Sequence, residues 1–320
     1  MISPPRIIIL TITVLWLSVF LASGLTVRIV RNTVGTSLDL SSTGACAAIA
    51  VQNSSVTCQA SIVDDTNLTP DQLLAAWDNL LRSNNDDMII GMSFMYATPI
   101  NTLAPKYPRK VFVIYDSAVN PPIDNVLGLT FAEDQSGFLA GALAGMFTTT
   151  KKVGVIGGLA IPPVKRFVNG YLNGVLSLCP TCDIYRIFEP SFVDTSLGQH
   201  AATVLMSKGA DVLFGAGGSM GSGGILYAAQ QNAFVIGVDV DESLTTFAGQ
   251  SSGQYLLASA MKNAGVAITS AIQAVQAGAK GGYNMLLDAS LNGVSLSSPL
   301  VSNAVKNFTS SVQVSIKTSG

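Results

Sequence analysis

The sequence has few histidines, few charged residues and, after its first 24 residues, no long apolar run. His200 is the one histidine among 320 residues, which excludes zinc chemistry built on paired histidines, and no metal site is predicted. Charged residues make up 11% of the chain and the net charge is −2, so the electrostatic footprint of a nucleic-acid partner is missing. The length allows two hydrophobic cores, and we therefore expect two domains or lobes.

The first residues are typical of a targeting segment. Arg6 precedes an apolar run, Ile7 to Ala22, and Ala22-Ser23-Gly24 offers the small residues that signal peptidase requires. The run is short for a membrane span, which favours a signal peptide over residues 1–24. We therefore expect a secreted or extracytoplasmic protein; the alternative is a membrane tether through an uncleaved signal anchor.

Three Asn-x-Ser/Thr sequons also point to a secretory route. Asn53, Asn67 and Asn307 are the predicted glycosylation sites, although the pattern is loose and each match can arise by chance.

Four cysteines fit the same oxidising compartment. Cys46 with Cys58 and Cys179 with Cys182 would each close a small loop, but four cysteines allow three pairings. Cys179-Pro-Thr-Cys182 also has the spacing of a thiol-redox motif. It follows an expected helix, whereas a redox motif opens one, and this favours a structural disulfide.

One βαβ unit, residues 211–242, organises the chain. A short apolar run, Val212 to Phe214, is followed by a glycine-serine turn, Gly215 to Gly224, an expected helix and a second apolar run. Neither run alternates with polar residues, as in strands buried on both faces. Parallel sheets bind ligands beyond the carboxyl ends of their strands, and both the glycine turn and Asp239 fall there.

The remaining chain continues this alternation, which predicts an α/β fold. Expected strands cover residues 27–30, 88–91, 111–115, 126–130, 184–188 and 255–258, and expected helices cover 72–82, 99–107, 133–147, 195–208 and 261–276. The helix from residue 72 has start signals, because Thr69 can cap it and Pro70 suits its first turn. We expect lobe 1 to comprise residues 25–131 plus 263–310, and lobe 2 residues 132–262.

Five stretches in one order carry a family resemblance. FAEDQSGFLAGALAG, VGVIGGLAIPPVKRFVNGYLNG, GADVLFGAGGSMGSGGILYAAQ, IGVDVDES and SAMK resemble the basic membrane protein family, the substrate-binding proteins of ABC transporters that bind purine nucleosides. The resemblance implies two Rossmann-like lobes with parallel sheets, as in type I periplasmic binding proteins, joined by three crossings with the ligand cleft between the lobes. It also implies a monomer without enzymatic activity or cofactor, binding a purine nucleoside or related ribosyl compound, with a membrane transporter or receptor as partner.

The chain departs from the family pattern in two places. The loop after the first strand, which supplies aromatic base contacts in the family, has no aromatic residue here between Arg31 and Ala50. No cysteine follows the signal peptide, so the bacterial lipid anchor is missing.

The resemblance also implies site residues. In the family a carboxylate at this strand end holds the ribose hydroxyls and a lysine at the start of the next helix assists; Asp239 and Lys262 match these positions. A carboxylate accepts two hydroxyl hydrogen bonds and an ammonium donates one. Asp239 as a turn cap and Lys262 as a solvated lysine are the structural alternatives.

Further candidates for the ligand site come from the strand ends. Phe214 could stack on a base, although core packing explains it equally well. Asp116 ends a lobe-one strand and is either a ligand contact or a turn aspartate. Gly217 and Gly218 either let the backbone approach a ligand or only make the turn.

A nucleotide-binding enzyme and a relative with another ligand or none are the alternatives to this function. An NAD(P)-dependent or other nucleotide-binding Rossmann enzyme needs a third glycine where the chain has Met220, and no His or Cys base accompanies the glycines. A sugar-binding relative, or one that binds no ligand, stays open, because lobe architecture does not determine the ligand.

Overall fold

The computed structural model describes residues 24–32, 37–63 and 68–297. The predicted signal peptide, apart from Gly24, and the sequons at Asn67 and Asn307 lie outside these residues. Among the described helices, none combines the length and the apolar character needed to cross a bilayer. The described residues divide into two compact units, one within residues 24–130 plus 264–285 and the other of residues 131–263 plus 286–297, so the chain passes between them at three points.

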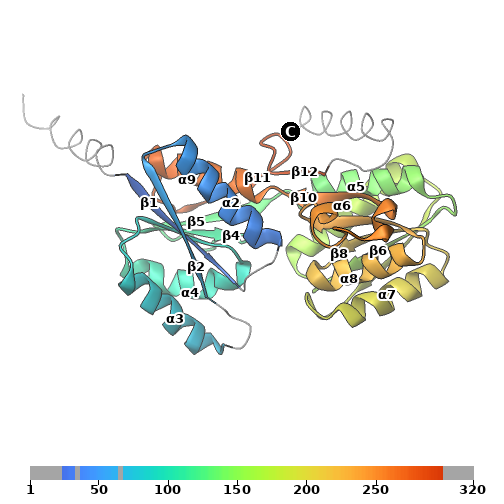
Figure 1. Cartoon of the computed structure of the whole chain (residues 1–320), viewed down its shortest axis with the longest axis horizontal. Coiled ribbons are helices and arrows are strands. Elements are labelled where there is room, and N and C mark those ends of the chain that lie inside the picture. The colour runs from blue at the N-terminus through green and yellow to red at the C-terminus, as the bar shows by residue number, and fades with distance from the viewer. Residues whose placement is uncertain (1–23, 33–36, 64–67, 298–320) are drawn as a thin grey trace, which may run out of the picture. The chain divides into compact units, whose positions relative to one another are not determined.

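The first unit contains a sheet whose strand order is β11-β5-β4-β3-β1-β2 (Figure 1). β1 pairs in parallel with β2 and β3, and β4 pairs in parallel with β3 and β5. This order reverses direction between β1 and β3, as in flavodoxin-like folds. The strands are β1 (Leu25–Arg31), β2 (Val56–Ile62), β3 (Met88–Gly91), β4 (Val111–Tyr115), β5 (Val126–Phe131) and β11 (Tyr283–Leu287).

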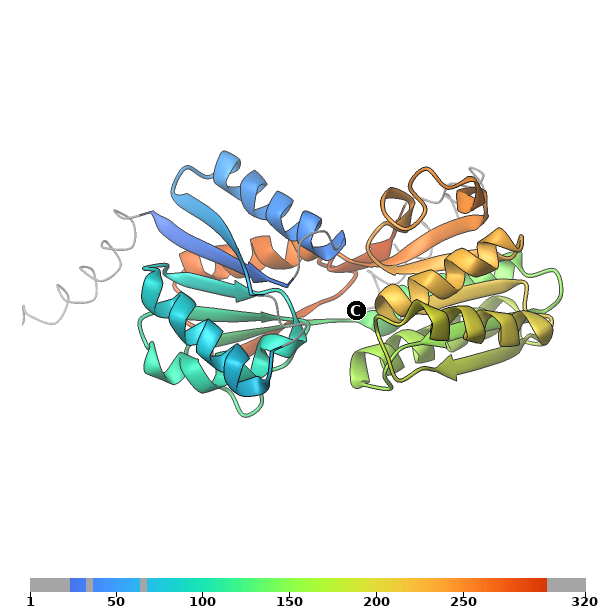
Figure 2. The same cartoon turned by 60° about the horizontal axis from the view of Figure 1, so that its bottom comes forward.

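Helices cover both faces of this sheet (Figure 2). One face packs on α3 and α4 through Trp77, Tyr96 and Ile100, whereas α2 packs against α9 on the other. α3 begins as its sequence predicts: Thr69 Oγ1 accepts the Gln72 N–H and the Gln72 side chain accepts the Thr69 N–H, which forms a capping box. The helices are α2 (Ser37–Gln52), α3 (Pro70–Ser83), α4 (Ala97–Leu103) and α9 (Ala264–Gln276).

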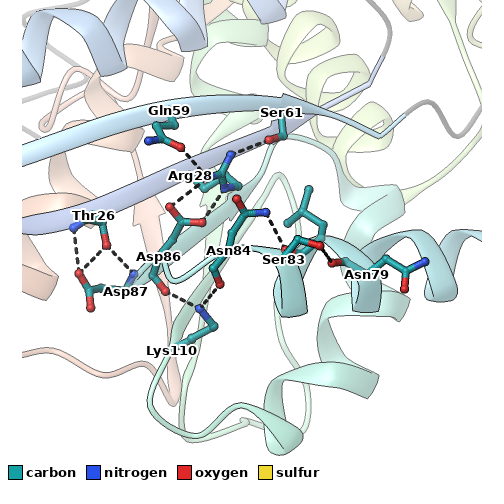
Figure 3. Close-up of polar contacts among 11 residues, drawn as sticks. Thr26, Arg28, Gln59, Ser61, Asn79, Ser83, Asn84, Asp86, Asp87 and Lys110 are labelled. Atoms are coloured by element: carbon teal, nitrogen blue, oxygen red, sulfur yellow. Dashed lines mark hydrogen bonds and ion pairs between the residues drawn. The ribbon is translucent and has the colours of Figure 1, made fainter.

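A buried polar cluster joins the residues that precede β3 and β4 to side chains of β1 and β2 (Figure 3). Arg28 on β1 donates to Asp86 through Nε at 2.5 Å and through Nη2 at 3.3 Å, and both residues are 7% exposed. Its guanidinium also donates to Ser61 and Gln59 of β2. Lys110 donates to the backbone carbonyls of Asn84, the C-cap residue of α3, and of Asp86, which lies between α3 and β3. Because Arg28 and Asp86 are buried and their polar groups are hydrogen-bonded within the cluster, we assign it a structural role.

The second unit repeats the arrangement with the strand order β12-β10-β9-β8-β6-β7. β6 to β10 are parallel, and β12 is antiparallel to β10. This pairing places described residues 286–297 in the second unit and not, as expected, in the first. The strands are β6 (Lys152–Gly157), β7 (Asp183–Phe188), β8 (Val212–Ala216), β9 (Phe234–Asp239), β10 (Leu256–Lys262) and β12 (Val294–Leu296).

Two helix pairs enclose the second sheet. α5 and α6 pack on one face of the sheet, and α7 and α8 pack on the other. Successive strand residues point to opposite faces, so Phe214 packs in the core with α6 and Leu213 in the core with α7 and α8. The helices are α5 (Glu133–Phe147), α6 (Pro162–Leu178), α7 (Thr195–Ser207) and α8 (Gly218–Gln230).

The glycines of α5 pack against α6 (Figure 1). A Cβ at Gly137 or Gly141 would overlap the backbone carbonyl of Phe167 or Tyr171 on α6. A Cβ at Gly174 of α6 would likewise overlap the Phe138 carbonyl. The two backbones therefore approach as closely as glycine permits.

Two helix boundaries differ from the prediction. α8 begins at Gly218, within the predicted glycine turn, and Gly217 is its N-cap. Both glycines lie close to neighbouring segments, Gly217 to Gly158 and Gly218 to Phe192. β10 extends to Lys262, and α9 begins only at Ala264. Lys262 therefore ends a strand and does not open a helix.

Candidate ligand-binding site

Asp239 and Lys262 lie side by side at the carboxyl edge of the second sheet. Asp239 is the last residue of β9 and pairs in register with Met261 of β10, the residue before Lys262. Its φ of 64° is left-handed, a conformation that only Asn, Asp and Gly adopt readily. The Lys262 ammonium nitrogen is 3.8 Å from Asp239 Oδ1. The parallel sheet thus brings together the two residues predicted for the ribose contact.

Lys262 is a buried cation, with a side chain only 5% exposed, and not the solvated lysine considered as an alternative. Its ammonium lies 5.6 Å from the centroid of the Phe131 ring and 5.3 Å from that of Phe167. Aromatic faces attract cations at such distances, most strongly when water is excluded. The same ammonium is 3.3 Å from Glu133 Oε1. Two carboxylates and two rings thus surround the ammonium.

Glu133, which the sequence did not single out, connects this lysine to an arginine. It is the first residue of α5 and its side chain is fully buried, with Oε2 accepting a hydrogen bond from Arg166 Nε at 2.7 Å. A carboxylate in the first turn of a helix is favoured by the helix dipole. Arg166 lies on α6 and is 41% exposed. Asp239, Lys262, Glu133 and Arg166 thus form a row of side chains whose charges alternate in sign. The two negative charges are balanced by the two positive charges.

The Asp239 carboxyl group has one buried oxygen and one outward oxygen. Oδ1 is buried towards Lys262, whereas the side chain as a whole is 42% exposed, so Oδ2 is the polar atom left at the surface. Burial of this carboxyl raises the pKa of Asp239, the charge of Lys262 lowers it, and the charge of Glu133 raises it further. An outward carboxylate oxygen next to a fixed ammonium can bind hydroxyl groups.

Asp116 occupies the corresponding edge of the first unit. It follows β4, is half-buried and has a left-handed φ of 63°. The turn after the neighbouring strand β3 exposes Phe94 by 39% and Met95 by 51%, and Ser93 Oγ accepts the Met95 N–H. The sequence does not single out these two apolar residues, because the family resemblance implies aromatic contacts only after the first strand.

Phe214 is a core residue. It is fully buried, stacks on Tyr171 with ring centroids 5.3 Å apart and makes an edge contact with Phe167 at 6.0 Å. Alternation along β8 points its ring at α6 and away from the surface. A ring without exposed surface cannot stack on a ligand in this conformation, so Phe214 is removed from the candidate site.

Close packing explains why glycines occupy the start of α8. A Cβ at Gly217 would come within 2.7 Å of the Met220 side chain and 3.0 Å of the Gly158 backbone nitrogen. Gly218 has a left-handed φ of 59°, and a Cβ there would lie 3.0 Å from the Phe192 carbonyl oxygen. These contacts account for glycine at both positions without a ligand.

Both predicted disulfides are present. Cys46–Cys58 joins α2 to β2, and Cys179–Cys182 closes the turn between α6 and β7. Cys179 caps the C-terminal end of α6, so this pair follows a helix as the sequence indicated.

Solute-binding proteins of ABC transporters share the fold. A solute-binding protein of an ABC transporter system from Aeropyrum pernix K1 matches with a TM-score of 0.73 and 21% sequence identity, covering 92% of each chain. At this identity the similarity concerns the fold alone. It confirms the predicted α/β architecture of a periplasmic-type binding protein with two parallel-sheet units.

Sequence comparisons identify the family. The profile of the family described as ABC transporter substrate-binding protein PnrA-like matches residues 49–319, and the chain belongs to this family. The CD4+ T-cell-stimulating antigen of Listeria monocytogenes is 31% identical over 165 residues, 49% of this chain and 45% of that protein. The ABC transporter nucleoside-binding protein BmpA of Lactococcus lactis is 29% identical over 192 residues, 57% of this chain and 54% of that protein. The chain thus spans about half the length of the curated relatives it matches.

Proposed function

We propose that this substrate-binding protein binds a purine nucleoside, or a related ribosyl compound, and that Asp239 in its second unit accepts hydrogen bonds from the ribose hydroxyls. The geometry of Asp239 carries the proposal: Lys262 faces Oδ1 and the side chain keeps 42% of its surface exposed. The family supports the ligand class, because one relative is named a nucleoside-binding protein.

The charge balance of the site favours an uncharged ligand. The carboxylates of Asp239 and Glu133 already face the cations of Lys262 and Arg166. A phosphate placed against Asp239 would add a like charge to this balanced set, which is unfavourable at short range. A hydroxyl group adds only hydrogen bonds. The proposed ligand is therefore a nucleoside and not a nucleotide.

The proposed role is delivery of this ligand to an ABC transporter, without chemical turnover. The family is one of substrate-binding proteins, which supports both the small-molecule ligand and a transporter partner. Two disulfides support an extracytoplasmic location, because disulfides persist in oxidising compartments. A signal peptide over residues 1–24 remains the predicted route of export.

Titration calorimetry with adenosine, guanosine and inosine tests the proposal. Each charge-assisted hydrogen bond contributes about 1.5–3 kcal/mol, so Asp239→Ala should weaken binding at least about tenfold. Asp183→Ala is the matched control, because Asp183 is an exposed carboxylate at the opposite, amino edge of the same sheet. If none of the three compounds binds the wild type, the proposed ligand class is wrong. Equal binding to wild type and Asp239→Ala would instead refute the ribose contact.

A further inference from the structure

A buried glutamate lies directly behind the proposed site. Glu242 follows Asp239 by three residues and begins a short 3-10 helix, η3 (Glu242–Leu244). It is 1% exposed, and its side chain turns back so that Oε1 accepts the Val238 N–H at 3.0 Å. Its own N–H donates to Ser259 Oγ of β10, also at 3.0 Å. Glu242 therefore connects the carboxyl end of β9, where Asp239 lies, to the neighbouring strand β10.

The strand makes room for this carboxyl group. A Cβ at Gly237 would lie 2.9 Å from the Glu242 carboxyl carbon and 2.6 Å from Ser259 Oγ, so no larger residue fits there without displacing them. The other neighbours of the carboxyl group are the hydroxyls of Ser222 on α8 and Thr246 after η3, and the charged neighbour is Asp239. Asp239, the proposed ligand contact, is thus an ionisable neighbour of Glu242.

The surroundings of Glu242 shift the pKa of its carboxyl group towards neutral pH. Burial, the largest cause, raises the pKa of Glu242 to about 7; the Thr246 hydroxyl, the Val238 N–H and the Ser222 hydroxyl lower the pKa, and the Asp239 charge adds to the rise. Below this pH the carboxyl group is neutral, and above it a second negative charge lies close to Asp239.

We propose that Glu242 is a positioning residue for Asp239 and that the proton on its carboxyl group regulates ligand binding at this site. The proposal rests on the proposed function, because Asp239 must be the ligand contact. Neutral Glu242 holds the end of β9 through Val238 without opposing the ionised Asp239 that ligand hydroxyls require. Ionised Glu242 repels that charge and weakens the arrangement.

The direction of the pH effect follows from linkage. A ligand that donates hydrogen bonds to Asp239 stabilises its ionised form, and an ionised Asp239 raises the pKa of Glu242. The complex therefore holds the Glu242 proton more tightly than the free protein does, so affinity falls as pH rises through about 7. Each pKa unit of coupling between the two sites corresponds to about a tenfold change in affinity.

Calorimetry of the full chain with adenosine and guanosine, from mildly acidic to mildly alkaline pH, tests the proposal. We expect wild-type affinity to fall severalfold with a midpoint near pH 7. Glu242→Gln keeps an acceptor for Val238 and cannot ionise, so it should retain the wild-type affinity of acidic pH and lose the pH dependence. Glu242→Ala should bind weakly at every pH. Asp241→Asn is the control: it removes a carboxylate one residue away, keeps an acceptor for Ser243, and should preserve the pH dependence.

A measurement on the wild type avoids any folding defect of the variants. The chain has three glutamates, Glu133, Glu189 and Glu242, so carbon-13 labelling of glutamate carboxyls gives three NMR signals. One should titrate near pH 7, disappear in Glu242→Gln and move to higher pH when adenosine is added. A midpoint unchanged by ligand, a pH-independent wild-type affinity, or a Glu242→Gln variant with the wild-type pH profile each overturns the proposal. If neither nucleoside binds the wild type at any pH, the proposed function fails and this proposal falls with it.

Discussion

Lys262 at the end of β10 and Glu133 at the start of α5 lie 129 positions apart in the chain, yet their ammonium and carboxylate groups are 3.3 Å apart with almost no exposed surface. Arg166 binds the other oxygen of Glu133. An ion pair buried to this extent requires every partner, because any charge left alone loses its hydration without compensation. Glu133 is therefore as important to the candidate site as the lysine that the sequence indicated.

Replacement of Glu133 should destabilise the second unit and weaken ligand binding together. Glu133→Ala removes the buried carboxylate that both the Lys262 ammonium and the Arg166 guanidinium contact, and the loss of one partner of a buried pair costs about 3–5 kcal/mol of unfolding free energy. Denaturant unfolding measures this cost, and calorimetry measures the affinity. Glu189→Gln, at a half-buried carboxylate beyond β7, is the control and should change neither quantity appreciably. A Glu133→Ala protein as stable as the wild type would contradict the pairing.

Deoxyribose analogues should separate the Asp239 contact from other effects of its replacement. Wild-type protein should bind 2′-deoxyadenosine more weakly than adenosine, because one hydroxyl bond to the carboxylate is missing. Asp239→Ala should bind the two compounds with nearly equal affinity, since the acceptor is already gone. The double comparison in one calorimetric series isolates this interaction. If the variant distinguishes adenosine from deoxyadenosine as strongly as wild type does, another residue holds the hydroxyl.

Much of the fold could be predicted because its signals are local. Uninterrupted apolar runs predict β3, β4 and β8, and the start of α3 follows from Thr69, Pro70 and their hydrogen-bonding rules. Parallel-sheet geometry then places Asp239 at a carboxyl edge. Each of these inferences needs only a few neighbouring residues.

The rest of the site depends on contacts between distant segments. Nothing near Glu133 or Arg166 in the sequence identifies them as partners of Lys262, because α5, α6 and β10 meet only in the folded unit. The sequence predicts a helix that already includes Met261 and Lys262, whereas sheet pairing extends β10 to residue 262. Successive side chains of β8 point to opposite, buried faces of the sheet. Only the position of α6 shows which of these faces Phe214 occupies.

The contact between α5 and α6 should tolerate no added methyl group. In Gly141→Ala the new Cβ would overlap the Tyr171 carbonyl oxygen, and backbone atoms on both sides prevent relief by a side-chain rotation. Such overpacking costs about 1–3 kcal/mol or more of unfolding free energy. Gly44→Ala on α2 is the matched control: a Cβ there meets no atom within 4 Å, and removing glycine from a helix should stabilise by about 0.5–1 kcal/mol. Equal thermal shifts for both variants would argue against the close packing.

The Arg28–Asp86 pair should contribute strongly to the stability of the first unit. Asp86→Ala leaves a guanidinium that is 7% exposed without its carboxylate, and such a change costs about 3–5 kcal/mol. Arg82→Ala is the control: it removes the 71% exposed partner of Asp78 in a helical pair, keeps the Tyr107 hydrogen bond to Asp78, and should have little effect. Because Asp86 precedes β3, at the amino edge of the first sheet, nucleoside affinity should be unchanged in any Asp86 variant that folds. Reduced affinity in a folded Asp86 variant would show that the amino edge influences the ligand site.

Cys179 and Cys182 should form a structural disulfide without redox activity. A redox-active cysteine needs a low thiol pKa, which a position at a helix N-terminus provides, whereas Cys179 caps the C-terminal end of α6, where the helix dipole disfavours a thiolate. In an insulin-reduction assay the wild type should be no more active than the double variant Cys179→Ser, Cys182→Ser. The double variant should be less stable than the wild type in denaturant, because the short loop loses its cross-link. Turnover by the wild type well above that of the double variant would show that the pair exchanges disulfides despite its place at the helix end.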